Sequence, residues 1–155
     1  MINTQWPRGV VLIAALVTMG GCSGGRPPAT LGLTEGRLAP CPGSPNCVSS
    51  QASADGPWVE ALRYAGDSGQ ARNRLLAVLK GMDRVQIQRA DANYIHAEFR
   101  SVLFGFVDDV EFYFDPPGVI QVRSASRLGY SDLGVNRERV ETIRARFAAT
   151  AGASS

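Results

Sequence analysis

The sequence has few of the residues that would identify a function directly. Histidine occurs once, as His96, and lysine once, as Lys80, so arginine supplies almost all of the 16 basic side chains. A net charge of +2 gives no electrostatic footprint for nucleic acid. One histidine and three cysteines are too few ligands for an ordinary zinc site. We therefore expect no metal, no cofactor and no nucleic-acid partner.

Long apolar runs and familiar catalytic motifs are also absent from the sequence. No stretch reaches the roughly 18 apolar residues that a membrane-spanning helix needs. The chain contains no G-x-S-x-G, no H-E-x-x-H and no phosphate-binding loop. Its 155 residues leave room for one domain.

The N-terminus resembles a bacterial lipoprotein signal. Arg8 is the only charged side chain before the apolar run at residues 10–19, which ends in Met19 and two glycines before Cys22. In the lipobox that this resembles, the cysteine is diacylated and becomes the mature N-terminus, and Ser23 after it favours the outer membrane, facing the periplasm. The alternative is an ordinary cleavage site beside an unmodified Cys22.

This interpretation divides the chain into four parts. Residues 1–21 are a lipoprotein signal peptide, and the Gly- and Pro-rich residues 22–40 are a flexible tether. Residues 41–150 form a single domain, and residues 151–155 a disordered tail. The protein is then held at the membrane by its lipid anchor.

Cys41 and Cys47 flank a short loop bent by two prolines and Gly43. Disulfides persist in exported proteins, and the bent loop lets the two sulfurs meet. A redox pair and a metal site are the alternatives, but redox pairs ordinarily have two residues between the cysteines. We favour a structural disulfide.

Residue periodicity predicts an α+β fold, with an antiparallel meander sheet of about five strands and two amphipathic helices packed on one face. A helix begins after the capping residue Asp67, and Asn136 caps a last helix. Alternating residues predict strands near residues 58–64, 85–88, 94–100, 106–114 and 119–126. We expect the second face of this sheet to be solvated.

Four segments, CPGSPNCVSS, YIHAEFRS, FVDDVEFYFD and VRSASRLGYSDLGVNRERVE, together resemble the family called domain of unknown function 1499. The resemblance runs from about Leu38 to the end of the last helix. It implies a bacterial, sometimes plastid, domain that is often membrane-attached. It brings no established activity.

One carboxylate is out of phase with its strand. Asp108 falls on the face that carries Val110 and Phe112, where a buried acid needs a cation, several donors or a proton. Arg100 and Arg127 are the nearest candidates by strand order. Asp108 is either a poised acid or ligand contact, or a rim residue reached by water.

The opposite strand face carries a group of charges: His96, Glu98, Arg100, Asp109, Glu111 and Arg123. Carboxylates with a histidine suggest a divalent cation or acid–base chemistry. Opposite charges on neighbouring strands also decorate ordinary wet sheet faces, which is the interpretation we favour.

The loop before the last helix is the better candidate for a site, because a helix N-terminus attracts anions. The candidate ligand or structural network consists of Asp108, Ser124, Ser126, Arg127, Asp132, Asn136 and Arg137. In the alternative, Asp132 is itself the anion and the loop serves folding. The apolar run at residues 102–107 either contacts a partner or membrane or folds back into the core.

Three functions remain open at this stage. The first is a non-catalytic envelope protein that binds an anionic small molecule or an envelope protein. The second is a hydrolase-type enzyme that uses Asp108, Asp109, Glu111 and His96, although no catalytic residue is assigned. The third is a purely structural protein.

Overall fold

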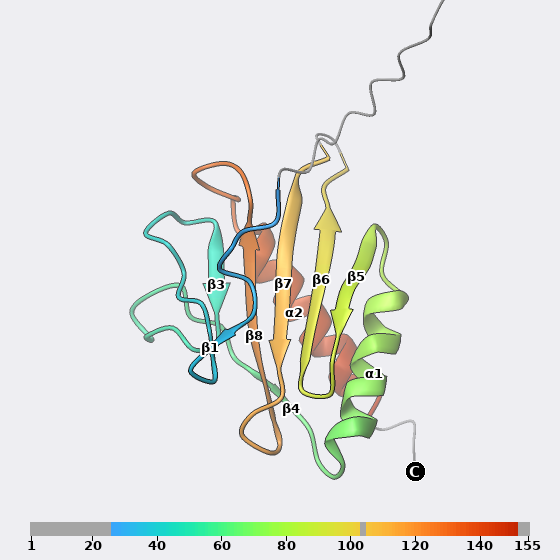
Figure 1. The fold of residues 1–155 in the computed structure, drawn as a ribbon. Helices are drawn as coiled ribbons and strands as arrows, with labels where there is room; N and C mark the ends of the chain where they lie inside the picture. The colour runs from blue at the N-terminus through green and yellow to red at the C-terminus, as the bar shows by residue number, and fades with distance from the viewer. Residues whose placement is uncertain (1–25, 103–104, 152–155) are drawn as a thin grey trace, which may run out of the picture.

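The computed structural model describes residues 26–102 and 105–151 (Figure 1). These residues form an α+β fold with two helices, a six-stranded antiparallel sheet and a small two-stranded sheet. The predicted fold class is confirmed, but the structure has more strands than we expected. The predicted signal peptide and Cys22 lie outside the described residues. Within the described ranges, no helix has the length and apolar character needed to cross a membrane.

Both helices form where apolar residues recur at helical spacing. Helix α1 (Ser68–Lys80) begins at Asp67, whose carboxylate accepts a hydrogen bond from the backbone N–H of Gln70 at 2.9 Å. Helix α2 (Val135–Ala149) buries Val140, Ile143 and Phe147. Asn136 is not its cap, contrary to the prediction. The cap position is Gly134, which has no side chain that could accept a hydrogen bond there.

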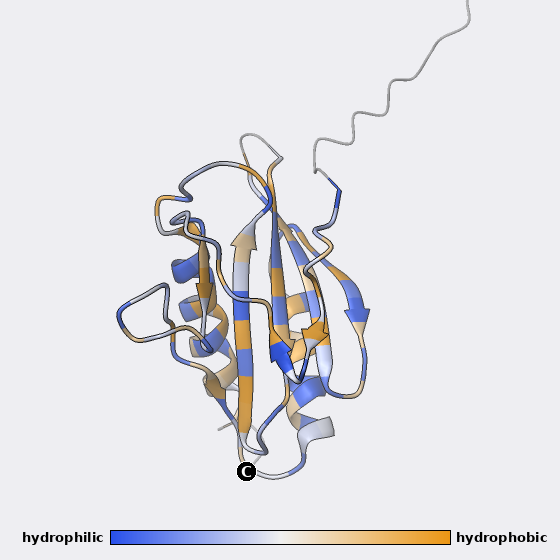
Figure 2. Cartoon of the chain, turned by 60° about the vertical axis from the view of Figure 1, so that its left-hand side comes forward, coloured by the Kyte–Doolittle hydropathy of each residue, from blue (hydrophilic) through white to orange (hydrophobic). Residues whose placement is uncertain are grey.

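Four consecutive strands form the centre of the sheet: β5 (Val85–Ala90), β6 (Tyr94–Arg100), β7 (Val107–Tyr113) and β8 (Val119–Ser126). Each is antiparallel to the next, as expected when short turns join successive strands. Their side chains alternate in hydropathy, which Figure 2 shows as blue and orange bands along the strands.

Two short strands share the outer edge of β8. β3 (Cys47–Ser49) pairs with residues 123–125, and β4 (Leu62–Arg63) pairs with residues 119–120. The strand predicted at residues 58–64 is thus only two residues long, and β3 was not predicted. A three-residue strand is too short for alternation to be recognised in a sequence.

The main core lies between the sheet and the helices. It combines Leu75 and Leu79 of α1 and Ile143 of α2 with sheet residues such as Ile95 and Phe112, all fully buried. Figure 1 shows α2 behind the sheet. This arrangement leaves the opposite face of the sheet to be covered by another part of the chain.

That opposite face is covered by residues 26–42, which we call the N-terminal cover. It contains the hairpin of β1 (Leu33–Thr34) and β2 (Arg37–Leu38), drawn in front of the sheet in Figure 1. Leu38 packs in a buried cluster with Tyr94 and Tyr113. The structure therefore differs from the predicted tether at residues 33–38, because Leu38 has an apolar partner surface on the sheet.

Candidate functional site

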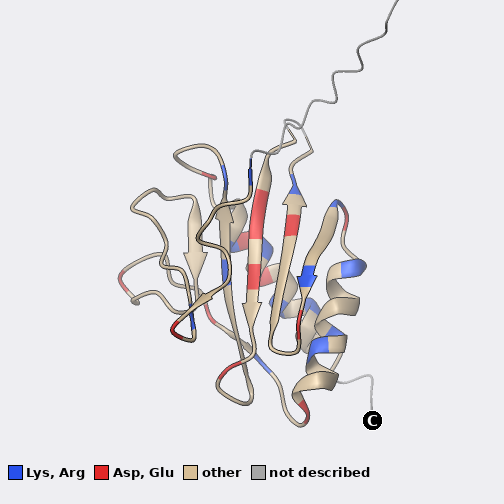
Figure 3. Ribbon diagram, viewed as in Figure 1, with Lys and Arg blue, Asp and Glu red and all other residues tan. Residues whose placement is uncertain are grey.

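The sheet face under the N-terminal cover, which we call the polar face, carries charged side chains. It comprises His96 and Glu98 of β6, Asp109 and Glu111 of β7, and Arg123 of β8, and Figure 3 shows the acidic bands on β6 and β7. We expected these charges to decorate a solvated surface, and this was wrong. All five residues are buried, and the cover reaches this face through the bond of Gly32 to Glu111.

Asp109 lies at the centre of one ion-pair cluster on this face. Its Oδ1 lies 2.7 Å from Nε2 of His96, and Arg127 donates from Nη2 to Oδ1 at 2.7 Å and from Nε to Oδ2 at 2.8 Å. Arg127 also pairs with Glu98, which in turn contacts Arg100 at 3.4 Å. Burial raises the pKa of Asp109, but the hydrogen bonds from Arg127 and His96 outweigh burial and hold it below its ordinary value.

Glu111 holds the second cluster, and no part of this carboxylate is exposed. Its Oε1 accepts hydrogen bonds from the hydroxyl of Tyr94 at 2.7 Å and from the backbone N–H of Gly32 at 2.8 Å. Its Oε2 accepts from Nη1 of Arg123 at 3.1 Å. Burial, followed by the bond to Glu111, raises the pKa of Tyr94, which therefore remains a donor. The cover thus contributes directly to this cluster through Gly32.

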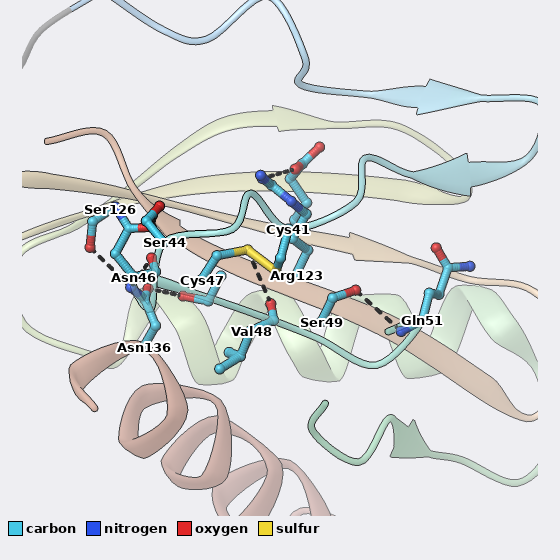
Figure 4. The surroundings of a disulfide bond; sticks show 12 residues. Cys41, Ser44, Asn46, Cys47, Val48, Ser49, Gln51, Arg123, Ser126 and Asn136 are labelled. Carbon is cyan, nitrogen blue, oxygen red and sulfur yellow. Dashed lines mark hydrogen bonds and ion pairs between the residues drawn. A yellow bond between two sulfur atoms is a disulfide. The ribbon is translucent and has the colours of Figure 1, made fainter. Parts of the chain in front are cut away.

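A pocket of about 330 Å³ opens between the cover and the polar face. Its sheet side includes Asp109, Arg123 and Arg127, and its other wall includes the prolines at positions 28, 40 and 42 together with Cys41. Cys41 forms a disulfide with Cys47, and Figure 4 shows Arg123 near this bond. Nε of Arg123 is buried and has no hydrogen-bond partner in the described parts of the chain.

An unpaired buried N–H is a costly feature, since a buried donor without a partner loses about 1–3 kcal/mol of hydration. Arg123 is only 6 % exposed, so bulk water does not freely solvate it. A guanidinium carries five N–H donors, arranged to bind planar or tetrahedral oxyanions. The pocket can therefore supply positive charge and hydrogen-bond donors to an oxygen anion.

Most of the candidate network predicted from the sequence meets on the helix side of the sheet, around Asn136. The Asn136 side chain bonds to the backbone oxygen of Asn46 at 3.0 Å, to Oγ of Ser126 at 3.0 Å and to Asp132 at 2.7 Å. Its amide oxygen accepts from Ser124. Figure 4 shows Asn46, Ser126 and Asn136 together beside the disulfide loop. This network joins the start of α2 to the end of β8 and to the chain before β3.

Asp108 belongs to the same helix-side network. It is buried, and its partner is Arg139 of α2 instead of Arg100 or Arg127, which we had considered nearest. Arg139 also donates to Asn136 at 2.6 Å and to Ser124 at 3.2 Å. These contacts form a closed set of paired groups, which is the pattern of a network that stabilises the fold.

The loop carboxylate Asp132 takes the place of an external anion at the start of α2. Its Oδ1 accepts from the backbone N–H of Gly134 at 3.0 Å, and its Oδ2 from that of Asn136 at 2.8 Å. Partial burial raises the pKa of Asp132, but these backbone donors outweigh burial and hold it below its ordinary value. Arg137 points elsewhere and donates to the backbone oxygen of Trp58 at 2.8 Å.

The site residues therefore separate into two groups. Asp108, Ser124, Ser126, Asp132 and Asn136 are brought together around α2, whereas Arg127 lies on the polar face and Arg137 at the surface. In the described part of the chain, no group of three or more His, Cys, Asp or Glu side chains is arranged to hold a metal ion.

Sequence reasoning missed Arg139, Tyr94 and Asn46 as members of these networks. Arg139 follows Asn136 by three residues, so both face the same side of α2, and this spacing was the available signal. The link between Gly32 and Glu111 joins residues 79 positions apart. No local pattern in the sequence indicates such a contact.

Comparison with known proteins identifies one family. The family model described as "Protein of unknown function (DUF1499)" matches residues 37–147, which include all elements of the main sheet and nearly all of α2. A search of the curated proteins found no significant match.

Proposed function

The chain belongs to the family of proteins of unknown function DUF1499, and we propose that it is a lipid-anchored envelope protein that binds an anionic small molecule, or an anionic group of an envelope partner. The proposed binding site is the pocket between the N-terminal cover and the polar face. The observation that carries this proposal is the buried Arg123, which lines that pocket and whose Nε has no hydrogen-bond partner among the described residues.

The charges around the pocket support an anionic ligand of modest size. Arg123 donates one hydrogen bond to Glu111, and this pairing fixes the guanidinium in place. Arg127 is held in the same way by Asp109. A volume of about 330 Å³ lies at the lower end of the range for small-molecule pockets, roughly 300–1,000 Å³. A carboxylate or phosphate group with a small substituent therefore fits the proposal best.

Binding is favoured over the hydrolase alternative by the state of the carboxylates. Both oxygens of Asp109 already accept hydrogen bonds from Arg127, and both oxygens of Glu111 are bonded as well. A general base needs a free oxygen within hydrogen-bond reach of a substrate proton. His96, moreover, is not among the residues that line the pocket.

The pocket is tested by titrating the protein with inorganic phosphate and with acetate while observing the Arg123 Nε–H signal by NMR. We expect this signal to shift in a saturable way with at least one anion. In Arg123→Lys, which keeps the charge but lacks Nε–H, affinity should fall about tenfold to a hundredfold, because a hydrogen bond to a charged group contributes about 1.5–3 kcal/mol.

Arg137→Lys is the matched control, since Arg137 lies at the surface and bonds a backbone oxygen. The control should bind the anion as the wild type does. Equal binding by Arg123→Lys and the wild type, or no response of the Nε–H signal to either anion, would rule out this pocket.

The lipid anchor is a separate part of the proposal, because Cys22 lies outside the described residues. The support for it is the lipobox-like sequence, in which small residues precede Cys22. When the full chain is produced in a Gram-negative host with an alkyne fatty acid, we expect labelling of the wild type and none of Cys22→Ala. Fractionation of the labelled cells should place the protein in the outer membrane, whereas labelled Cys22→Ala would contradict lipidation at this residue.

A further inference from the structure

One end of the molecule exposes large apolar side chains on two neighbouring connections. They are Val102 and Phe106, between β6 and β7, then Leu128, Tyr130 and Leu133, between β8 and α2, and Val135, the first residue of α2. These six residues, which we call the apolar end, are most of the large apolar side chains exposed in the described ranges. They lie together because β6 and β8 end, and β7 begins, at the same end of the sheet (Figure 1).

Leu133 is the least expected of these residues. The residue is 93 % exposed, and its φ of +55° lies in the left-handed region that leucine rarely adopts. Neither property stabilises the fold, since water meets nearly the whole side chain and the backbone is strained. Folding alone therefore does not explain a leucine at this position.

Four of these six residues, Val102, Phe106, Leu133 and Val135, line a groove of about 740 Å³. Phe99, Val102, Phe106, Leu133 and Val135 contribute apolar walls. The rim carries Arg84, Arg100, Arg139 and Arg146 together with the acids Asp83 and Glu138. Arg139 is already paired with Asp108 and Arg100 with Glu98, so the other two arginines balance the two acids. An apolar floor with arginines at its edge suits an interface where acyl chains meet phosphate groups.

The position of the chain start identifies the occupant of this surface. The described chain begins at Arg26, at the same end of the molecule as the tips of β6 and β8 (Figure 1). Only residues 23–25 separate Arg26 from Cys22. Four residue steps span at most about 14 Å when fully extended. A lipid on Cys22 therefore holds this end of the domain next to the bilayer.

We propose that the apolar end docks on the bilayer surface, with Leu133 and Val102 inserted among the lipids and the arginine rim at the phosphate level. This docking rests on the proposed lipid anchor for its orientation. The anchor brings the surface to the membrane, and the docked end then holds the polar-face pocket in a fixed position above it.

The test uses the unacylated mature chain, residues 22–155 with Cys22→Ala. All contacts described above lie within residues 26–151, so removal of the signal peptide takes away none of them. Partition is measured by co-sedimentation with vesicles of phosphatidylethanolamine and phosphatidylglycerol. We expect binding that weakens about tenfold in Leu133→Asn combined with Val102→Ser, since each tenfold step corresponds to about 1.4 kcal/mol of lost apolar burial.

The choice of asparagine separates docking from folding. Asparagine tolerates a positive φ better than leucine, so the thermal midpoint of Leu133→Asn should not fall. Leu33→Asn is the matched control, because Leu33 is an exposed leucine in β1, away from the apolar end. It should leave vesicle binding unchanged.

Three outcomes would overturn the docking proposal. They are vesicle binding that is unaffected by the double substitution, an equal loss in Leu33→Asn, and self-association of the chain through this end without vesicle binding. Fatty-acid labelling of Cys22 and anion binding at Arg123 are measured independently of all three. Their failure would remove the proposed function, whereas failure of vesicle binding alone would remove only the docking.

Discussion

Asp108 and Asp109 are neighbours in the chain, yet each is buried on a different face of the sheet with its own arginine. Asp108 pairs with Arg139 on the helix side, and Asp109 pairs with Arg127 on the polar face. Buried charges are tolerated when they are paired and hydrogen-bonded, as both are here. A change to either arginine therefore acts mainly through the acid that it leaves behind.

We expect Arg139→Met to lower the free energy of unfolding by about 3 kcal/mol, because loss of one partner leaves a buried carboxylate without compensation. The Arg139 guanidinium lies over the ring of Phe99, 4.9 Å from its centroid, and methionine keeps an apolar contact with this ring. Urea unfolding at neutral pH provides the measurement. Arg146 is an exposed residue of the same helix, so Arg146→Met should change the free energy of unfolding by less than about 0.5 kcal/mol. Equal effects would show that Asp108 does not need its partner.

Acid should destabilise the protein through Asp109 and Asp132, whose pKa values lie below the ordinary value of about 3.9. A depressed pKa in the folded state contributes stability that is present above the unfolded value and is lost as pH falls through the folded value. Between pH 7 and pH 3, the free energy of unfolding should therefore decrease. The decrease should be smaller in Asp132→Asn than in the wild type.

Asp55→Asn is the control for this pH dependence, because Asp55 is exposed and makes no hydrogen bond among the contacts of the described residues. Urea midpoints for the three proteins are compared at both pH values. If Asp132→Asn and Asp55→Asn retain the same acid dependence as the wild type, the bonds from Gly134 and Asn136 do not set the behaviour of Asp132.

The start of α1 offers a test of local structure. Asp67 accepts the backbone N–H of Gln70, so Asp67→Ala leaves this N–H without its partner and should cost about 1 kcal/mol of stability. Asp67→Asn should recover most of this loss, because asparagine is an equally good cap. Thermal or urea unfolding of both variants makes the comparison. Equal destabilisation by alanine and asparagine would mean that the cap contributes through its charge instead of its hydrogen bond.

Elements with regular spacing could be predicted from the sequence. The buried stripe of Ala71, Leu75 and Leu79 has helical period, and β5 to β8 were found from alternation and from turns rich in Asp, Asn, Pro and Gly. β3 was missed because it has only three residues and lies directly after the cysteine loop. Local periodicity thus identifies the long elements and fails for elements that exist only through a distant partner.

The candidate site was harder to predict for a related reason. Alternation correctly assigned Glu98, Asp109 and Glu111 to one face, but it cannot tell whether that face meets water or another segment. The cover over it is rich in Gly and Pro, which ordinarily predicts a tether. Its burial of Leu38 and its bond to Glu111 depend on residues more than 50 positions away.

At the scale of the whole molecule, the disulfide joins the N-terminal cover to the sheet. Cys41 lies in the cover, and Cys47 is the first residue of β3, which pairs with β8. The bond closes a short loop whose constraint is worth about 2 kcal/mol in the chain-entropy account. It therefore restrains how far the cover can move from the polar face.

Cys41→Ser combined with Cys47→Ser should keep the fold but loosen the cover. We expect a loss of about 2 kcal/mol in stability and a larger increase of hydrogen exchange at Gly32 and Leu38 than within β6 and β7. Hydrogen exchange resolved by residue is the measurement. The wild type in a reducing agent is the matched comparison. A uniform increase across cover and sheet would show that the cover does not open separately.

The position of the N-terminal cover also has a consequence for the order of events during biosynthesis. Residues 26–42 are made before β7 exists, although Gly32 must bond to Glu111, 79 positions later. The meander from β5 to β8 joins strands that are neighbours in sequence, so it can assemble before the N-terminal cover has docked on it. We expect pulse-labelling of refolding protein to protect β6 and β7 first and the cover last. The charges of the polar face would then be solvated in the intermediate and buried only in the native state. The last step of folding is therefore also the step that creates the pocket.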